Sequence, residues 1–195
     1  KLKDENIKWF TETDISLAED DQLLDLMRES GCQQVLIGFE SPSKKGLDGL
    51  ELSSNWKMKK LGRYKYAIDK IQSHGITVNG CFILGLDGQD KSIFDEVWEF
   101  AKESGLYEVQ ITIMTAFPGT PLYRRLIDEK RVIKHADWAR CTLFDVNFQP
   151  KSMSVGELEK SFRDLAEKIY STEFTQQRRD RYRKIRKKVL RKKAA

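Results

Sequence analysis

Four apolar, strand-like runs alternate with amphipathic helical stretches, and this alternation restricts the fold more than any other feature of the chain. The runs are IKWFTET, QVLIGFES, TVNGCFILGLDG and VQITIMTAFPGTP. Near-continuous apolar runs are typical of parallel strands covered on both faces, and the helices between them are the crossovers that such strands require. Repeated βα units of about 30 residues therefore predict a parallel α/β sheet.

The boundaries of the predicted elements follow from capping residues and glycines. We expect strands at 7–13, 34–40, 77–84 and 108–115, and helices at 16–30, 57–73 and 92–104. Ser16 is the predicted N-cap of the first helix, and a glycine follows each of the three helices. Four strands cannot close a barrel, because about eight are needed to fill its interior. The sheet therefore stays open, or further strands precede Lys1.

Polar or glycine-rich residues follow each predicted strand. Ligands of parallel α/β folds bind at the carboxyl ends of the strands. We therefore expect one common opening to be lined by the tips at Thr13, Glu40–Ser41, Gly85–Asp87 and Thr115–Pro118. A carboxylate at the end of an apolar strand needs a donor or a cation, so Glu40 either caps a loop or holds a ligand amine or hydroxyl. Asp87 either binds a ligand or closes an Asx turn.

Composition favours one globular core in a reducing compartment. The chain has 195 residues, of which 33% are charged, and its apolar runs are all shorter than the roughly 20 residues of a membrane helix. It has no signal-peptide pattern, so we expect a cytoplasmic protein. Cys32, Cys81 and Cys141 are widely spaced, which argues against a disulfide framework. We expect Cys32 and Cys81 to be small buried hydrophobes. The start at Lys1, without a methionine, is interpreted as a cut edge.

The C-terminal residues carry a separate positive charge. From Arg178 to Lys193 there are eleven Lys or Arg residues and one acid, whereas the rest of the chain has 24 basic and 29 acidic residues. This tail is interpreted either as a solvated helix that packs through Tyr182, Ile185, Val189 and Leu190, or as a contact for an anionic membrane. It lacks the interleaved aromatic residues that stack on bases, which argues against a nucleic-acid partner.

Several common catalytic motifs are absent from the sequence. It contains no GxGxxG, Walker loop, HExxH, GxSxG or CxxC. His74 and His135 lie far apart, and His74 is placed to interact with the carboxyl end of a helix. We therefore predict no catalytic residue and no metal site made by this chain alone.

Taken in order, the strings GFES, NGCFILGLDG and TAFPGTPLYRRL resemble the later half of a radical SAM domain. They are similar in particular to the group in which that domain follows a cobalamin-binding domain. The run NFQPKSMSVGELEKSF resembles the C-terminal extension of hopanoid C-methylase-like proteins. The resemblance covers about residues 9–182. It implies the last four βα units of a partial TIM-like (β/α) barrel at 1–121, a family extension at 122–177 and a basic helical tail at 178–195.

The resemblance also implies that S-adenosylmethionine lies across the carboxyl ends of the strands. Glu40 and Ser41 match the strand end near its amino and ribose groups. The segment from Gly80 to Gly85 matches the one near adenine and ribose, and 109–115 matches the last strand, which borders the adenine. Lys57, Lys60 or Arg63 could reach the carboxylate of the ligand. The implied cofactor-binding set is Glu40, Ser41, Gly80, Gly85, Asp87 and Thr115.

One family motif is missing, and this decides what the chain can do by itself. Radical SAM enzymes hold a 4Fe-4S cluster with three cysteines spaced CxxxCxxC, and the sequence does not contain this spacing. We therefore expect the C-terminal portion of a radical SAM enzyme, with cluster ligands, and possible cobalamin, supplied by an upstream part of the same protein. The expected reaction is radical methylation or rearrangement of a small-molecule or lipid substrate.

Two other classes remain open. One is a cluster-less, non-catalytic binding module that acts through its basic tail, and the other is an unrelated parallel α/β enzyme with a nucleotide cofactor. If the chain is a fragment, its incomplete barrel exposes an apolar sheet edge, so we expect the isolated chain to dimerise or aggregate.

Overall fold

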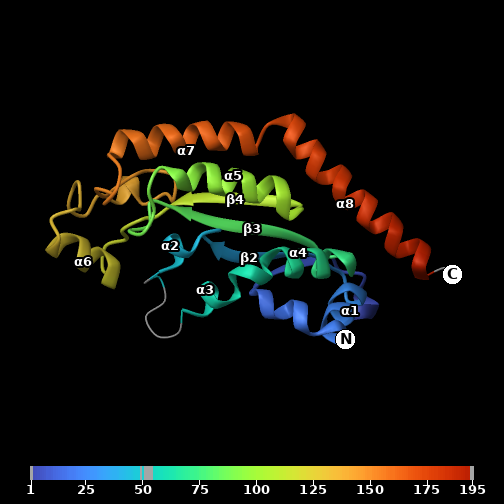
Figure 1. Ribbon diagram of the computed structural model, residues 1–195. Helices are drawn as coiled ribbons and strands as arrows, with labels where there is room; N and C mark the ends of the chain where they lie inside the picture. Colours follow the sequence, from blue (N-terminus) through green and yellow to red (C-terminus); the bar gives the residue numbers. More distant parts are fainter. Residues whose placement is uncertain (1, 49, 51–54, 194–195) are drawn as a thin grey trace.

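A computed structural model describes residues 2–48, 50 and 55–193, and it contains a four-stranded parallel sheet (Figure 1). The strands are β1 (Trp9–Thr13), β2 (Cys32–Glu40), β3 (Thr77–Leu84) and β4 (Glu108–Ile113). They lie side by side in chain order, and each neighbouring pair is parallel. The predicted α/β fold is confirmed, and the arrangement is compatible with part of a β/α barrel followed by C-terminal helices.

Three helices connect the strands, and shorter helical segments accompany them. The crossovers contain α1 (Asp21–Glu29), α4 (Tyr64–Ser73) and α5 (Ser92–Ser104). The short segments of this part are η1 (Leu2–Glu5), η2 (Ile15–Glu19), α2 (Lys44–Leu47), α3 (Trp56–Lys60) and η3 (Leu61–Arg63). After β4 come α6 (Pro121–Asp128), η4 (Trp138–Arg140), α7 (Val155–Ile169) and α8 (Thr172–Lys193).

The two faces of the sheet differ in how completely they are covered. On the helix side, Phe39 and Phe82 stack with ring centroids 5.8 Å apart, and Tyr64 of α4 packs edge-on against Phe39. The opposite side, here called the open face, carries side chains that are only half-buried. Its members are Leu36, Gly38, Glu40, Asn79, Cys81, Ile83, Gln110 and Thr112. Strand alternation places both sets, because successive side chains point to opposite faces.

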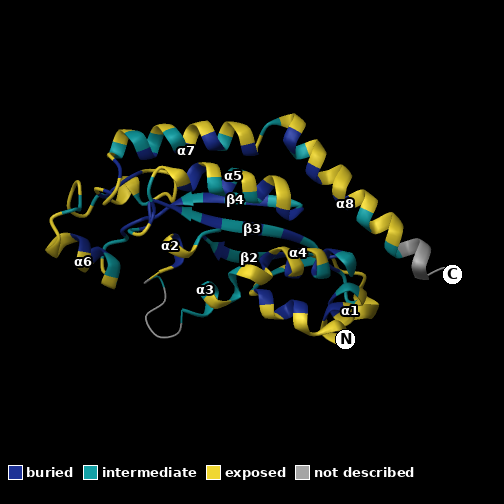
Figure 2. Ribbon diagram, in the orientation of Figure 1, coloured by how far each residue is buried: buried dark blue, intermediate teal, exposed yellow. Residues whose placement is uncertain are grey.

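The carboxyl ends of the strands point toward α2 and α6, whereas α8 runs past their amino ends (Figure 1). Most of α8 is exposed (Figure 2), but one stripe packs on the body through Phe174, Arg178 and Tyr182. The ring of Tyr182 lies 5.2 Å from that of Tyr107. The predicted boundary at residue 178 falls inside this continuous helix, and the side chain of Leu190 lies outside the described residues.

Some predicted boundaries differ from the structure for local reasons. Ser16 does not cap a long helix, because η2 intervenes and Asp20 caps α1 by accepting from the Leu23 N–H at 2.9 Å. The helix predicted at 57–73 is divided into α3, η3 and α4, with Gly62 in the 3₁₀ segment, where its lack of a side chain weakens the α-helix. β4 ends at Ile113, so Thr115 follows the strand.

The cysteines have different surroundings. Cys32 is fully buried, as expected, but Cys81 is half-buried on the open face because it alternates with the buried Gly80 and Phe82. Burial, with the charges of Glu40 and Glu12 adding to it, raises the pKa of Cys81 to about 11. Its thiol is therefore protonated at neutral pH.

The helix α7, within the C-terminal extension, begins with a reciprocal pair of capping hydrogen bonds. Ser154 Oγ accepts from the Glu157 N–H at 3.2 Å, and Glu157 Oε2 accepts from the Ser154 N–H at 2.8 Å. Together the two bonds form a capping box, and the Ser-x-x-Glu spacing that such a box requires is present in the sequence. None of the helices in the described part of the chain is both long and apolar enough to cross a membrane.

Candidate binding site at the carboxyl ends of the strands

Glu40 lies on the open face at the irregular end of β2. The register shifts between Gly38 and Glu40, and Glu40 has φ of 62°, in the left-handed region. Its Oε1 accepts a hydrogen bond from Lys57 Nζ at 2.5 Å, and both side chains are mostly buried. A side chain at Gly38 would collide with this carboxylate, because an added Cβ would lie 2.5 Å from Glu40 Oε1. Gly38 therefore makes room for the pair.

Ser41 is fully buried in the turn that follows Glu40. Its Oγ accepts from the Ser43 N–H at 3.3 Å, and Ser43 in turn caps α2. A Cβ on Gly46 would lie 2.1 Å from Ser41 Oγ, so α2 approaches closely only because this position is a glycine. In this structure Ser41 organises the turn from its interior.

The loop after β3 is held by three hydrogen bonds between its backbone and the side chain of Gln89. Gln89 Oε1 accepts from the N–H groups of Gly85 at 2.8 Å and Leu86 at 3.1 Å, and its Nε2 donates to Ile83 O at 2.9 Å. Gly85 has φ of 89°, and an added Cβ would lie 2.9 Å from Leu158 Cδ2 of α7. The loop is therefore fixed between Gln89 and α7.

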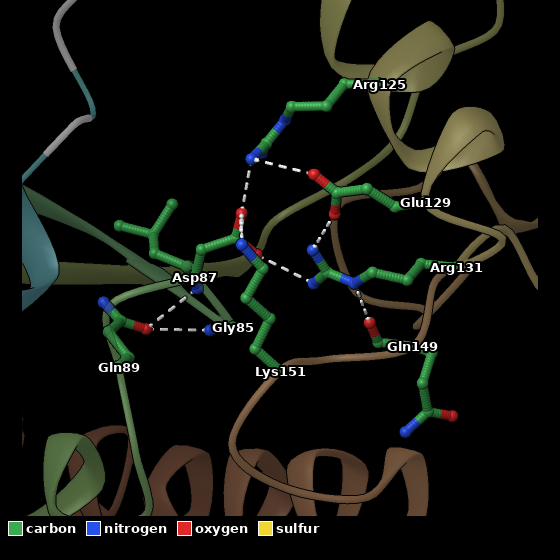
Figure 3. Close-up of polar contacts among 9 residues, drawn as sticks. Gly85, Asp87, Gln89, Arg125, Glu129, Arg131, Gln149 and Lys151 are labelled. Carbon is green, nitrogen blue, oxygen red and sulfur yellow. Dashed lines mark hydrogen bonds and ion pairs between the residues drawn. The ribbon is translucent and has the colours of Figure 1, made fainter.

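Asp87 lies at the centre of a charge cluster (Figure 3). Arg125 Nη1 donates to its Oδ2 at 2.6 Å, Arg131 Nη2 donates to its Oδ1 at 2.7 Å, and Lys151 Nζ is 3.4 Å from Oδ2. Glu129 joins Arg125 and Arg131, at 3.7 Å and 2.7 Å. Partial burial alone would raise the pKa of Asp87, but the hydrogen bonds from Arg131 and Arg125 outweigh it, and this pKa lies below its usual value. Asp87 is therefore a carboxylate at neutral pH.

A cavity of about 710 Å³ opens beside this cluster, at the carboxyl ends of β3 and β4. Its walls come from α2 and the loop after it, from the ends of β3 and β4 and the loops that follow them, from the first turns of α6, and from Leu143 and Lys151. Apolar side chains dominate the lining: Leu50, Ile83, Leu86, Met114, Phe117 and Leu122. The volume falls within the range of small-molecule sites, roughly 300–1,000 Å³.

The irregular segment 132–150, which precedes α7, forms part of this wall. Leu143 O accepts from the Ile113 N–H at 2.7 Å, so the segment lies against the free edge of β4. Asn147 is buried, and its side chain accepts from the Ala116 N–H and donates to Ala116 O, each at 3.0 Å. These contacts fix the segment that includes the predicted residue Thr115, whose hydroxyl donates to Ile113 O at 3.0 Å.

The structure brings some of the predicted site residues together and separates others. Asp87 and Thr115 line the cavity, whereas Glu40 lies one strand away on the open face, beside Lys57. Gly80 faces the helices, where a Cβ would lie 2.7 Å from Leu106 Cδ1, so close packing explains this glycine. Lys60 and Arg63, the other predicted cations, instead pair with Glu19 at 3.0 and 2.8 Å.

Sequence reasoning missed Gln89, Arg125, Arg131 and Lys151. Gln89 follows the GLDG string, and its three contacts to one loop appear only when that loop folds back on it. Arg125 stands in the quoted string TAFPGTPLYRRL, and Arg131 and Lys151 flank the irregular segment. Nothing local indicates that these cations converge on Asp87.

Comparisons with known proteins found a family match in the C-terminal part of the chain and several relatives. Residues 120–195 match the family described as a domain of unknown function (DUF4070). Bacteriochlorophyllide d C-12(1)-methyltransferase of Chlorobaculum tepidum is 25% identical over 164 residues, which are 84% of this chain and 34% of that protein. Hopanoid C-2 methylase of Rhodopseudomonas palustris is 29% identical over 122 residues, 63% of this chain and 22% of that protein.

A third relative extends the range of reactions. Anaerobic magnesium-protoporphyrin IX monomethyl ester cyclase of Cereibacter sphaeroides is 25% identical over 155 residues, 79% of this chain and 24% of that protein. The chain thus spans between 22% and 34% of the length of these three proteins. These matches confirm the resemblance to the radical SAM family that was found in the sequence, and the chain is similar to methyltransferases and a cyclase of that family.

Proposed function

We propose that this chain is the part of a radical SAM enzyme that supplies strand ends for S-adenosylmethionine and one wall of the substrate site. The observation that carries this proposal is the position of the Glu40–Lys57 pair and the apolar cavity at the same end of a parallel sheet. Ligands of such sheets bind at the carboxyl ends of the strands.

The residues at the end of β2 fit the amino-acid moiety of S-adenosylmethionine. That moiety carries an ammonium and a carboxylate, and Glu40 and Lys57 offer the opposite charge to each. Their side chains are 18% and 23% exposed, so the site is partly dehydrated and charge-assisted hydrogen bonds are strong there. On binding, the ammonium of the ligand would replace Lys57 beside Glu40, and its carboxylate would replace Glu40 beside Lys57. The absence of a side chain at Gly38 keeps the approach open. When bound to a cluster, S-adenosylmethionine supplies the 5′-deoxyadenosyl radical.

The cluster ligands are proposed to lie in another part of the same protein. The described residues contain no group of three or more His, Cys, Asp or Glu side chains that could hold a metal ion. The sequence also lacks CxxxCxxC. We propose that an upstream segment provides the 4Fe-4S cluster, and that a cobalamin-binding domain precedes it, as the resemblance implies.

The proposed reaction is radical methylation or cyclisation, or a related rearrangement, of a largely apolar small molecule or lipid. The names of the relatives include a bacteriochlorophyllide, a hopanoid and a protoporphyrin ester, which share a large apolar framework. The apolar lining of the cavity supports a substrate of this kind.

The test is to co-produce the chain with the polypeptide encoded upstream, to reconstitute the cluster without oxygen, and to measure formation of 5′-deoxyadenosine. We expect turnover by the assembled protein, and Glu40→Gln should weaken binding of S-adenosylmethionine by about tenfold through loss of a charge-assisted bond. Glu99→Gln, at an exposed position on α5, is the control. An assembled protein with a cluster but no cleavage of S-adenosylmethionine would refute the proposal.

Two further measurements separate the other classes. Titration calorimetry of the isolated chain should show no tight binding of ATP, because an unrelated nucleotide-dependent enzyme would bind its cofactor unaided. The binding-module alternative is favoured by the exposed basic side of α8, which includes Arg179, Arg183 and Lys184. It predicts that the chain binds anionic vesicles and that no upstream segment encodes cluster ligands.

A further inference from the structure

The charges at the rim of the cavity are unevenly distributed. Three cations, Arg125, Arg131 and Lys151, surround two carboxylates, Asp87 and Glu129. The cluster therefore carries one excess positive charge. The lining also includes the exposed Asp48, which follows α2. The α6 side of the cavity is consequently positive.

The three cations differ in how exposed they are and in how many partners they bind. Arg131 is 11% exposed, and it donates to Asp87, to Glu129 and to Gln149 O at 2.7 Å. Arg125 and Lys151 are 47% and 48% exposed and share one oxygen, Asp87 Oδ2. Figure 3 shows both reaching that oxygen from different segments. Arg131 thus holds the cluster together, whereas Arg125 and Lys151 present N–H donors at the rim.

The same two residues border the apolar wall. Arg125 and Lys151 line the cavity together with Leu122 and Leu143, from α6 and the irregular segment. An occupant that fills the apolar part can therefore place an acidic group at the rim without moving any buried charge. An arginine and a lysine beside one site suit a carboxylate, which accepts hydrogen bonds from both.

We propose that the cavity binds a free small molecule with a large apolar body and a carboxylate, and that Arg125 and Lys151 hold the carboxylate. The inference rests on the proposed function in that the occupant is the substrate of the same enzyme. The proposed function gives this substrate an apolar framework that fits the cavity lining. The inference adds that the substrate carries a carboxylate, which binds at the α6 side of the cavity.

The experiment uses a matched pair of probes and the 195-residue chain. Fluorescence titration compares dansyl-labelled undecanoic acid with its methyl ester, which has the same apolar body but no charge. We expect the acid to bind about tenfold more tightly than the ester, as hydrogen bonds to charged groups allow. Arg125→Gln combined with Lys151→Gln should reduce the affinity for the acid to that for the ester. Arg124→Gln, the neighbouring exposed position on α6, should leave both affinities unchanged.

A circular dichroism spectrum of each variant shows that it is folded. Equal binding of acid and ester, unchanged binding by the double variant, or no binding of either probe to a folded chain would each overturn the inference. The outcomes also separate it from the proposed function. If the chain binds the acid selectively but the assembled protein does not cleave S-adenosylmethionine, the carboxylate-bearing ligand is supported and the proposed enzymatic function is refuted. If the assembled protein cleaves S-adenosylmethionine but the chain does not prefer the acid, only the proposed ligand is refuted.

Discussion

Gln89 Oε1 accepts a hydrogen bond from the Gly85 N–H at 2.8 Å, and this contact joins the start of the β3 loop to its end. Both residues are buried, so the loop has no water to replace the bond. The rigidity of the cavity wall that carries Asp87 therefore depends on a neutral amide beneath it.

Gln89→Leu should destabilise the fold. The leucine removes the partner of two N–H groups and one carbonyl, and buried groups left unpaired cost about 3 kcal/mol in total. Urea denaturation measures the change in the free energy of unfolding. Gln176→Leu, on the exposed side of α8, is the control and should change it little. A loss as small as that of the control would show that the loop does not depend on Gln89.

Asp87→Asn should weaken the dependence of stability on acid pH. The pKa of Asp87 is lower in the folded state than in the unfolded state, where it is about 4. The carboxylate of Asp87 therefore stabilises the fold above the unfolded pKa, and this contribution is lost as pH falls through the folded pKa. Urea unfolding between about pH 7 and pH 3 measures the slope for wild type and variant. At neutral pH the variant should lose about 2 kcal/mol. Identical slopes would contradict the role of the cluster.

Phe10→Lys should reduce self-association of the isolated chain. Phe10 is 74% exposed on β1, which is an outer strand of the sheet, whereas the other outer strand has its Ile111 N–H bonded to Tyr170 Oη at 3.3 Å. A buried phenylalanine contributes about 1.5–3 kcal/mol, so dimerisation should weaken by roughly tenfold or more. Light scattering over a concentration series measures this. Trp138→Lys, at an exposed position outside the sheet, is the control, and a monomeric wild-type chain would contradict the prediction.

Ser154→Ala should destabilise the C-terminal extension by about 1 kcal/mol, the usual cost of a lost N-cap. The hydroxyl accepts from the Glu157 N–H, and Lys91 also binds the carboxylate of Glu157. Hydrogen bonds from Lys91 and Ser154 lower the pKa of Glu157 to about 2. Ser152→Ala, at an exposed position before the helix, should have little effect on thermal unfolding. Equal effects of the two substitutions would show that the capping box does not stabilise α7.

Local patterns in the sequence determined the parallel α/β character of the sheet and the Ser154–Glu157 spacing of the capping box. These features depend on residues that are close together in the sequence, such as the apolar run 77–84 or the pair Ser154 and Glu157. Their interactions form within a single strand or at a single helix end, so a local pattern is enough to predict them. The same patterns indicated which strand ends carry polar residues. Family resemblance, confirmed by the relatives, then identified the end of β2 as a cofactor contact to be tested.

Tertiary structure decided which of those residues meet. Gly80 was expected near the ligand but faces Leu106, because strand alternation turns it to the helix side. Asp87 finds Arg125, Arg131 and Lys151 only when segments 38 to 64 residues farther along the chain fold back to β3. Such pairing depends on chain connections that no local pattern records, and ion pairs are too weak to direct the fold by themselves. The cavity and its charged rim are therefore properties of the packed molecule.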